Sequence, residues 1–290
     1  MRVLLTGASG QLGQAVQEQA GSHIKLGAFA SSKLDITQAA QVERMLNEFG
    51  PDVVINAAAY TQVDKAESDI QAAQAVNVDG VGHLARTCQV LGAHLIHVST
   101  DFVFDGEADQ PYTPTHATNP QSVYGRSKRD GERLALELLG SQASIVRTSW
   151  LYGPGGQNFV TTMLRLFRQR PLVRVVDDQQ GSPSCTLGLA QALLCMASEQ
   201  KLQGGLYHWS DQGETSWFGF ASEILRLAQA RNSAFQGVQL EPISTAEYPT
   251  PASRPGYSVL QCSMPELAGM PAPRPWQQAL SDCFERLLLQ

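Results

Sequence analysis

A tyrosine and a lysine four residues apart are side chains suited to proton transfer. Tyr124 and Lys128 begin and end the segment YGRSK, and residues four apart share one face of a helix. A free phenol has a pKa of about 10, which is too high for efficient proton transfer near neutrality. We expect the ammonium group of Lys128 to stabilise the phenolate and to lower the pKa of Tyr124. Tyr124 would then act as a proton donor with Lys128 as its partner.

A hydroxyl group lies at the end of an expected strand, next to an acid. The strand His94–Ser99 is followed by Thr100 and Asp101. Ligands bind at the carboxyl edge of an open parallel sheet. Thr100 at that edge can hydrogen-bond a substrate carbonyl oxygen and position it for hydride attack. We therefore predict that Thr100 works with Tyr124 and Lys128 as a catalytic group.

Three glycines with the spacing G-x-x-G-x-x-G follow the first expected strand, Arg2–Thr6. Gly7 permits a tight turn, Gly10 lets the backbone approach a pyrophosphate, and Gly13 lets the next helix pack close to the sheet. The N-terminus of that helix presents free N–H groups to phosphates. This position between a strand and a helix predicts a dinucleotide site.

Two other strand ends bear on the cofactor. Ser31, Ser32 and Lys33 follow the second strand, with no acid before Asp35. An acid there would bind the ribose hydroxyls of NAD, whereas two hydroxyls and a cation suit a 2′-phosphate. The segment favours NADPH, with NADH possible, and an ordinary solvated loop remains an equal alternative. The small residues Ala57, Ala58 and Ala59 after the third strand would let a ligand lie against its end.

The elements that position these groups alternate between strand and helix. The expected strands are Arg2–Thr6, Ile24–Gly27, Val53–Asn56, His94–Ser99 and Ser144–Thr148, and the expected helices are Gln11–Ala20, Ala39–Phe49, Gln71–Leu91 and Val123–Leu139. This alternation predicts an α/β fold with a doubly wound parallel sheet, the Rossmann fold. Beyond residue 150 the pattern changes to a helix Asn158–Gln169, a strand Leu172–Val176 and a proline-rich end. We expect a dinucleotide-binding domain over 1–150, to which some later segments return. Residues 151–290 would mainly form a smaller, irregular substrate-binding lobe.

The composition excludes several classes of protein. The 290 residues carry a net charge of −6, which argues against nucleic-acid binding. No long apolar run indicates a membrane span, and the start of the chain is typical of a first strand rather than a signal peptide. The five cysteines are widely spaced, as expected for free thiols in the cytoplasm. We expect the six histidines to fill the core or lie on the surface, and we expect no metal site.

Together these motifs resemble the dTDP-4-dehydrorhamnose reductase family of extended short-chain dehydrogenases/reductases. The resemblance covers nearly the whole chain and is carried by the following segments: Gly7–Gly13, Asn56–Thr61, Val63–Glu67, Ser99–Phe104, Tyr124–Lys128, Arg147–Trp150, Asp178–Gln179 and Thr250–Pro255. It implies hydride transfer from NADPH or NADH to the C4 ketone of dTDP-4-dehydro-β-L-rhamnose. The product, dTDP-L-rhamnose, would serve the synthesis of cell-surface polysaccharide such as lipopolysaccharide O-antigen.

The resemblance also implies roles for residues. Those expected to bind the cofactor are Gly10, Gln11 and Leu12 at the pyrophosphate, Asp35 and Ile36 at the adenine, Ala59, Tyr60 and Thr61 along the middle, and Val98 beneath the nicotinamide. Tyr124 and Lys128 are expected to bind it as well, with Lys128 at the nicotinamide ribose. Those expected at the substrate are Thr100, Asp101 and Tyr124 at the sugar, Trp150 at the hexose or base, and Arg254 at the diphosphate. Some family members bind magnesium through glutamates, one of them on the first helix. The stretch Gln11–Val16 has no acid, which argues against bound Mg²⁺ and any assembly that depends on it. The oligomeric state, monomer or homodimer, stays open.

Two other interpretations remain, namely another enzyme that acts on nucleotide sugars and a regulatory subunit. A reductase for a 4-keto-hexose on a different nucleotide would need few changes in sequence. Nucleotide-sugar dehydratases of this superfamily have an acid where this chain has Phe102, and epimerases usually have an acid after the second strand, which is absent here. The β subunit of methionine adenosyltransferase resembles this family and binds NADP without catalysis. Intact Thr100, Tyr124 and Lys128 favour an enzyme over such a regulatory subunit without excluding it.

Overall fold

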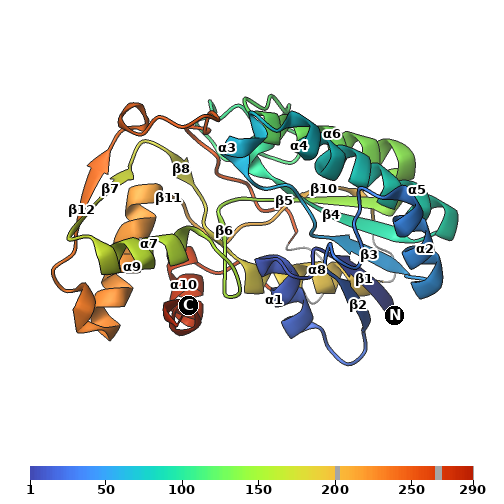
Figure 1. The fold of residues 1–290 in the computed structure, drawn as a ribbon, viewed down its shortest axis with the longest axis horizontal. Coiled ribbons are helices and arrows are strands. Elements are labelled where there is room, and N and C mark those ends of the chain that lie inside the picture. Colours follow the sequence, from blue (N-terminus) through green and yellow to red (C-terminus); the bar gives the residue numbers. More distant parts are fainter. Residues whose placement is uncertain (200–202, 265–269, 290) are drawn as a thin grey trace.

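A six-stranded parallel sheet forms the centre of the computed structural model, which describes residues 1–199, 203–264 and 270–289 (Figure 1). The strands lie in the order β10-β5-β4-β3-β1-β2. Their bounds are Arg2–Thr6 for β1, Lys25–Phe29 for β2, Val53–Asn56 for β3, His94–Thr100 for β4, Ala143–Thr148 for β5 and Gly205–His208 for β10. Every pairing within this sheet is parallel. The predicted doubly wound α/β fold is confirmed.

Helices cover both faces of the sheet. On one face lie α1 (Gln11–Gln19) and α8 (Thr186–Ser198), and on the other α2 (Ala39–Phe49), α5 (Gly80–Leu91) and α6 (Val123–Leu139). Successive strand residues point to opposite faces, so Leu5 packs in the first core and Leu4 in the second. Because β10 and α8 come from beyond residue 150, the chain returns to the sheet after entering the second lobe.

Two elements differ from the sequence prediction by more than one residue at an end. The second strand is Lys25–Phe29 rather than Ile24–Gly27, because all five of its residues pair with the five of β1. The long helix expected over Gln71–Leu91 is divided into α4 (Ile70–Gln74), a π-helical turn over Ala75–Asp79, and α5. A π turn inserts an extra residue into a helix and often marks a functional site.

The second lobe has a helical core of its own. Its main elements are α7 (Phe159–Gln169), α9 (Trp217–Arg231), α10 (Trp276–Leu288) and the pair β7 (Leu172–Val176) with β12 (Gln239–Ile243). In Figure 1 these lie beyond the carboxyl edge of the large sheet. The short elements are α3 (Val63–Ala66), β6 (Leu151–Tyr152), β8 (Gln180–Gly181), β9 (Ser184–Cys185), β11 (Thr215–Ser216) and 3-10 turns at Asp101–Val103, Gly140–Gln142, Ser233–Phe235 and Thr245–Glu247. Within the described residues, no helix is both long and apolar enough to span a membrane.

Candidate active site

The glycine loop between β1 and α1 forms a backbone cradle. Gly7 has a φ of +68°, and a Cβ atom there would lie 2.6 Å from the carbonyl carbon of Ala57. A Cβ on Gly13 would lie 2.2 Å from the carbonyl oxygen of Gly7, so the helix reaches the loop only with glycine at this position. Gly10 caps α1 without a side-chain hydrogen bond, which leaves the first-turn N–H groups of Gln11 and Leu12 to an anion. The cradle fits a dinucleotide pyrophosphate.

The turn after β2 lies beside this cradle. The N–H of Ala8 donates to the carbonyl oxygen of Phe29 at 3.1 Å, and the turn continues into Ser31, Ser32 and Lys33, which are exposed. Their role at a 2′-phosphate stays a prediction.

Asp35 and Ile36 follow that turn. Asp35 accepts hydrogen bonds from the backbone N–H and the hydroxyl of Thr37 at 3.0 and 2.8 Å. Ile36 is buried against Gly80 at the start of α5. Their contact with adenine stays a prediction.

Asn77, which the sequence analysis did not single out, holds the segment after β3 in place. Its Oδ1 accepts from the backbone N–H of Tyr60 at 2.9 Å, and its Nδ2 donates to the carbonyl oxygen of Tyr60 at 3.1 Å and to Ser127 Oγ at 3.0 Å. Asn77 lies in the π turn and is buried. It thus joins the predicted cofactor segment Ala57–Thr61 to the helix of Tyr124. The one signal in the sequence was a polar residue within the apolar run AVNV.

Tyr124 and Lys128 are both buried on α6, whose N-terminus is capped by Ser122. They lie one turn apart near the end of β4, where Thr100 Oγ1 donates to Asp101 Oδ1 at 2.9 Å. Thr100 lies near enough to Tyr124 to act on the pKa of its phenol. The geometry therefore brings the three predicted catalytic residues to one strand end.

The expected lowering of the pKa of Tyr124 is wrong. Burial raises the pKa of Tyr124 to about 12; the hydrogen bond with Thr100 opposes this shift and the charge of Asp101 adds to it. Lys128 instead donates to the carbonyl oxygen of Val98 at 2.8 Å and lies 3.2 Å from Nε2 of His97. Burial lowers the pKa of Lys128 to about 8, against the charge of Glu132.

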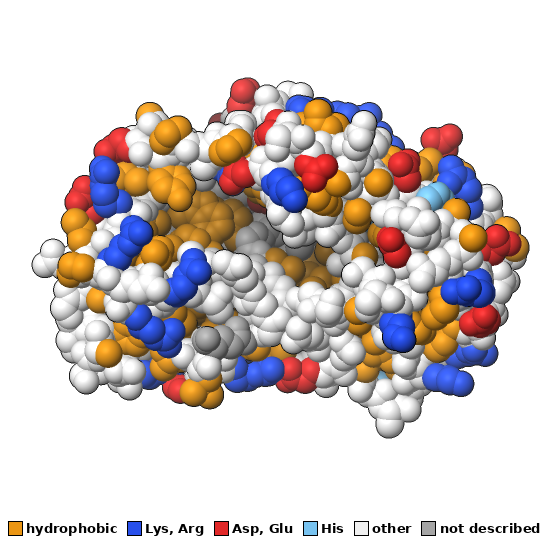
Figure 2. Space-filling model, in the orientation of Figure 1, with side chains coloured by type: hydrophobic (Ala, Val, Ile, Leu, Met, Phe, Trp, Pro, Cys, Tyr) orange, Lys and Arg blue, Asp and Glu red, His pale blue; other side chains and the backbone are white. Residues whose placement is uncertain are grey.

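Trp150 lies at the junction of the lobes in an unusual conformation. Its φ of +45° is the one positive value outside glycine among the described residues. Its ring stacks on Trp217 with centroids 3.5 Å apart and planes 6° from parallel, and Trp217 Nε1 donates to Gln179 Oε1 at 3.2 Å. The sequence analysis missed Trp217, which comes from α9, 67 positions away. Figure 2 shows that the surface is hollowed between the lobes, with hydrophobic side chains inside the hollow.

Arg254 pairs with Asp64 of α3. The Nη1–Oδ1 and Nη2–Oδ2 distances are 2.8 and 2.7 Å, and this hydrogen bonding lowers the pKa of Asp64. The guanidinium is thus held at the edge of the sheet-bearing lobe. Its role at a diphosphate stays a prediction.

Comparison with known proteins identifies the family. A family model described as the RmlD substrate binding domain matches residues 1–289. A dTDP-4-dehydrorhamnose reductase from Streptomyces griseus is 41% identical over 292 residues, covering 99% of this chain and 94% of the relative. The chain belongs to the RmlD family of dTDP-4-dehydrorhamnose reductases.

Solved structures of the RmlD family agree with this assignment. A dTDP-4-dehydrorhamnose reductase from Clostridium acetobutylicum has a TM-score of 0.92 and 40% identity, with 100% of both chains covered. The enzyme from Bacillus anthracis, solved in complex with NADP, has a TM-score of 0.89 and 38% identity, with 98% of both chains covered.

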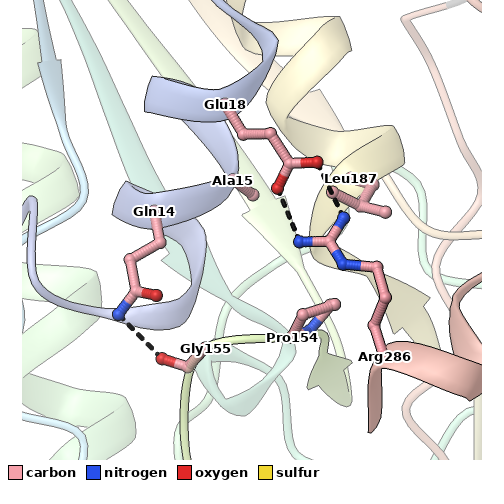
Figure 3. Close-up of a pocket in the computed structure, with 7 residues that line it drawn as sticks. All are labelled: Gln14, Ala15, Glu18, Pro154, Gly155, Leu187 and Arg286. Atoms are coloured by element: carbon pink, nitrogen blue, oxygen red, sulfur yellow. Dashed lines mark hydrogen bonds and ion pairs between the residues drawn. The ribbon is translucent and has the colours of Figure 1, made fainter.

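The residues of the first helix do not fit the magnesium ion that the sequence analysis considered. Its acid, Glu18, receives two hydrogen bonds of 2.7 Å from the guanidinium of Arg286 on α10 (Figure 3). The remaining residues that line this pocket are Gln14, Ala15, Pro154, Gly155 and Leu187. A cation thus already neutralises the single carboxylate here, and the lining offers none of the further acids that Mg²⁺ prefers.

Asp101 gives a prediction about stability and pH. Burial raises its pKa from 3.8 to about 6, although hydrogen bonds from Thr100 and Ser258 oppose the shift. A carboxyl whose pKa is higher in the folded protein stabilises the fold below pH 3.8 and loses this contribution as pH rises through 6. We expect Asp101→Asn to match the parent protein near pH 3.5 and to exceed its free energy of unfolding at pH 8, by at most about 3 kcal/mol.

Urea denaturation at both pH values measures this difference. Asp105→Asn is the matched control, because a hydrogen bond from Tyr112 lowers the pKa of Asp105. This control should therefore be destabilised at pH 8. A loss of stability at pH 8 in Asp101→Asn would contradict the prediction.

Proposed function

We propose that this chain is a reductase that uses NADPH to reduce the C4 ketone of dTDP-4-dehydro-β-L-rhamnose. The product is dTDP-L-rhamnose for cell-surface polysaccharide. The observation that carries the proposal is the meeting of Tyr124 and Thr100 at the carboxyl end of β4, beside Lys128 and at the same sheet edge as the glycine loop. The names of its relatives support this activity. No disulfide bond joins cysteines in the part of the chain that the structure describes, which supports a cytoplasmic location.

The chain's own groups position the ketone and supply a proton. Gly10, Gln11 and Leu12 would hold NADPH along the glycine loop, and the bound NADPH would supply a hydride for C4. The Thr100 hydroxyl turns from Asp101 to donate to the ketone oxygen. The Tyr124 hydroxyl gives its proton to that oxygen, so the alkoxide becomes an alcohol and the tyrosine becomes a phenolate. The ammonium form of Lys128 stabilises the phenolate, which takes a new proton before the next turnover.

Burial suits Tyr124 to this direction of reaction. With a pKa of about 12, the phenol holds its proton at neutral pH and transfers it when a stronger base appears. An alkoxide is such a base. A dehydratase needs a further acid and base. Phe102 supplies neither; its ring packs edge-on against that of Tyr124, with the ring centroids 5.5 Å apart.

The test is NADPH oxidation, followed at 340 nm with a panel of nucleotide-linked 4-keto-hexoses and repeated with NADH. We expect the fastest oxidation with dTDP-4-dehydro-β-L-rhamnose and NADPH, with dTDP-L-rhamnose as the product by mass spectrometry. Faster reduction of another 4-keto-sugar would contradict the proposed substrate, and a strict requirement for NADH would contradict the proposed cofactor. Co-purification with a stoichiometric methionine adenosyltransferase, without reduction of any sugar, would favour the regulatory-subunit alternative.

A further inference from the structure

A row of buried polar side chains crosses the sheet and ends at Lys128. Thr6 of β1, Asn56 of β3 and His97 of β4 are register partners in neighbouring strands, and each has an exposed fraction of 0%. Thr6 Oγ1 donates to Asn56 Oδ1 at 2.6 Å, and Asn56 Nδ2 lies 2.9 Å from His97 Nδ1. His97 Nε2 in turn lies 3.2 Å from Lys128 Nζ.

The partners of Asn56 determine which ring nitrogen of His97 carries a proton. Oδ1 of Asn56 accepts from Thr6 and from the backbone N–H of Ala58 at 3.2 Å. A rotated amide would place its NH₂ group against that N–H, so Nδ2 must face His97. His97 Nδ1 therefore accepts. Burial and the charge of Lys128 keep the pKa of His97 well below its ordinary value, so the ring is neutral and its single proton lies on Nε2.

The Nε2–H group points at the nitrogen of Lys128. A neutral amine has a lone pair that can accept this hydrogen, while one of its own N–H groups donates to the carbonyl oxygen of Val98. An ammonium group has no lone pair, so two donors would face each other at 3.2 Å. We propose that His97, oriented by Asn56 and Thr6, is a positioning residue that donates to the neutral amine of Lys128 and so sets the pH above which the lysine is no longer an ammonium ion.

The other charged or titratable groups near Lys128 do not cancel this effect. Glu132, one turn further along α6, favours the ammonium form, but Arg147 of β5 neutralises it with hydrogen bonds of 2.9 and 2.6 Å. Tyr124 keeps its proton at neutral pH. The charge of Asp101 raises the pKa of Tyr124 at the end of β4. His97 is the group whose N–H faces the lysine nitrogen.

The kinetic consequence rests on the proposed function. If the ammonium form stabilises the phenolate of Tyr124, reduction fails when Lys128 loses its proton. His97 lowers the pH at which Lys128 loses its proton. It therefore couples the activity of the site to the hydrogen bonds of Asn56 and Thr6, at the base of the glycine loop.

The first experiment uses the ligand-free protein and needs no activity. Lysine labelled with ¹³C at the ε carbon gives five signals, one for each lysine of the chain, and Lys128→Met assigns the signal of Lys128. We expect His97→Gln to raise the titration midpoint of Lys128 by about one pH unit, since an amide oxygen can accept from the ammonium group. His94→Gln is the control, because His94 lies on the same strand but contacts Ser144. It should leave the midpoint unchanged.

Two further measurements separate positioning from a merely structural role. ¹⁵N spectra of the parent protein should show His97 protonated on Nε2 and uncharged at pH 7, which requires no variant. In the kcat profile, the basic limb should move to higher pH in His97→Gln. A proton on Nδ1, a charged ring, or an unmoved Lys128 midpoint would overturn the proposal. If the NMR results are as expected but the protein reduces no keto-sugar, the role of His97 is supported and only the proposed function is contradicted.

Discussion

Replacing Tyr124 with Phe is expected to lower kcat by about 100- to 10,000-fold, the range that general acid catalysis contributes. The phenyl ring keeps the edge-on contact with Phe102, so the packing of α6 is preserved. What is lost is the O–H that donates a proton to the alkoxide. Lys128 and the glycine loop are untouched, so the Kd for NADPH should stay within about twofold.

The measurement pairs kcat for NADPH oxidation with a calorimetric titration of NADPH. Tyr207→Phe is the matched control, since Tyr207 lies on the edge strand β10 and its hydroxyl donates to the carbonyl oxygen of Gln203, which precedes that strand. It should retain the parent turnover. Unchanged turnover in Tyr124→Phe would contradict the assigned role, and lost NADPH binding would show that the phenol holds the cofactor instead.

The fold was predictable because its signals are local. Runs of β-branched and aliphatic residues defined the strands of the sheet, and a glycine or proline precedes or follows several of them. The helix over residues 71–91 was predicted as continuous because its apolar periodicity persists through Ala75–Asp79. The π turn there depends on Asn77, whose partners Tyr60 and Ser127 come from other segments. Sequence spacing does not contain such contacts.

The positions of site residues were predictable only where the spacing of residues along a single helix or strand determines them. Four residues on one helix bring Tyr124 and Lys128 to one face, and a strand end places Thr100. Trp217 packs against Trp150 from a helix that is far away in the sequence, so no local sequence pattern predicted this contact. The sign of the Tyr124 pKa shift was wrong for the same reason. The spacing indicated a nearby cation, whereas burial and the hydrogen bonds of Lys128 to β4 arise only in the folded chain.

Arg147→Met is expected to reduce the free energy of unfolding by about 3–5 kcal/mol. Arg147 of β5 and Glu132 of α6 form a bidentate pair, and their side chains are 2% and 3% exposed. The guanidinium also donates to the carbonyl oxygen of Pro114 and lies over the ring of Phe104. Without Arg147, Glu132 must either remain charged in the core or be protonated at a cost.

A double-mutant cycle distinguishes an unpaired charge from lost packing. Glu132→Gln combined with Arg147→Met removes both charges, so we expect urea denaturation to show that the double variant is more stable than Arg147→Met alone. The surface control is Arg226→Met, whose partner is Glu223 and whose side chain is 65% exposed. It should change the free energy by less than about 1 kcal/mol. Because the buried pair fixes α6 against β5, one turn beyond Lys128, a loss below 1 kcal/mol in Arg147→Met would mean that packing alone holds the catalytic helix.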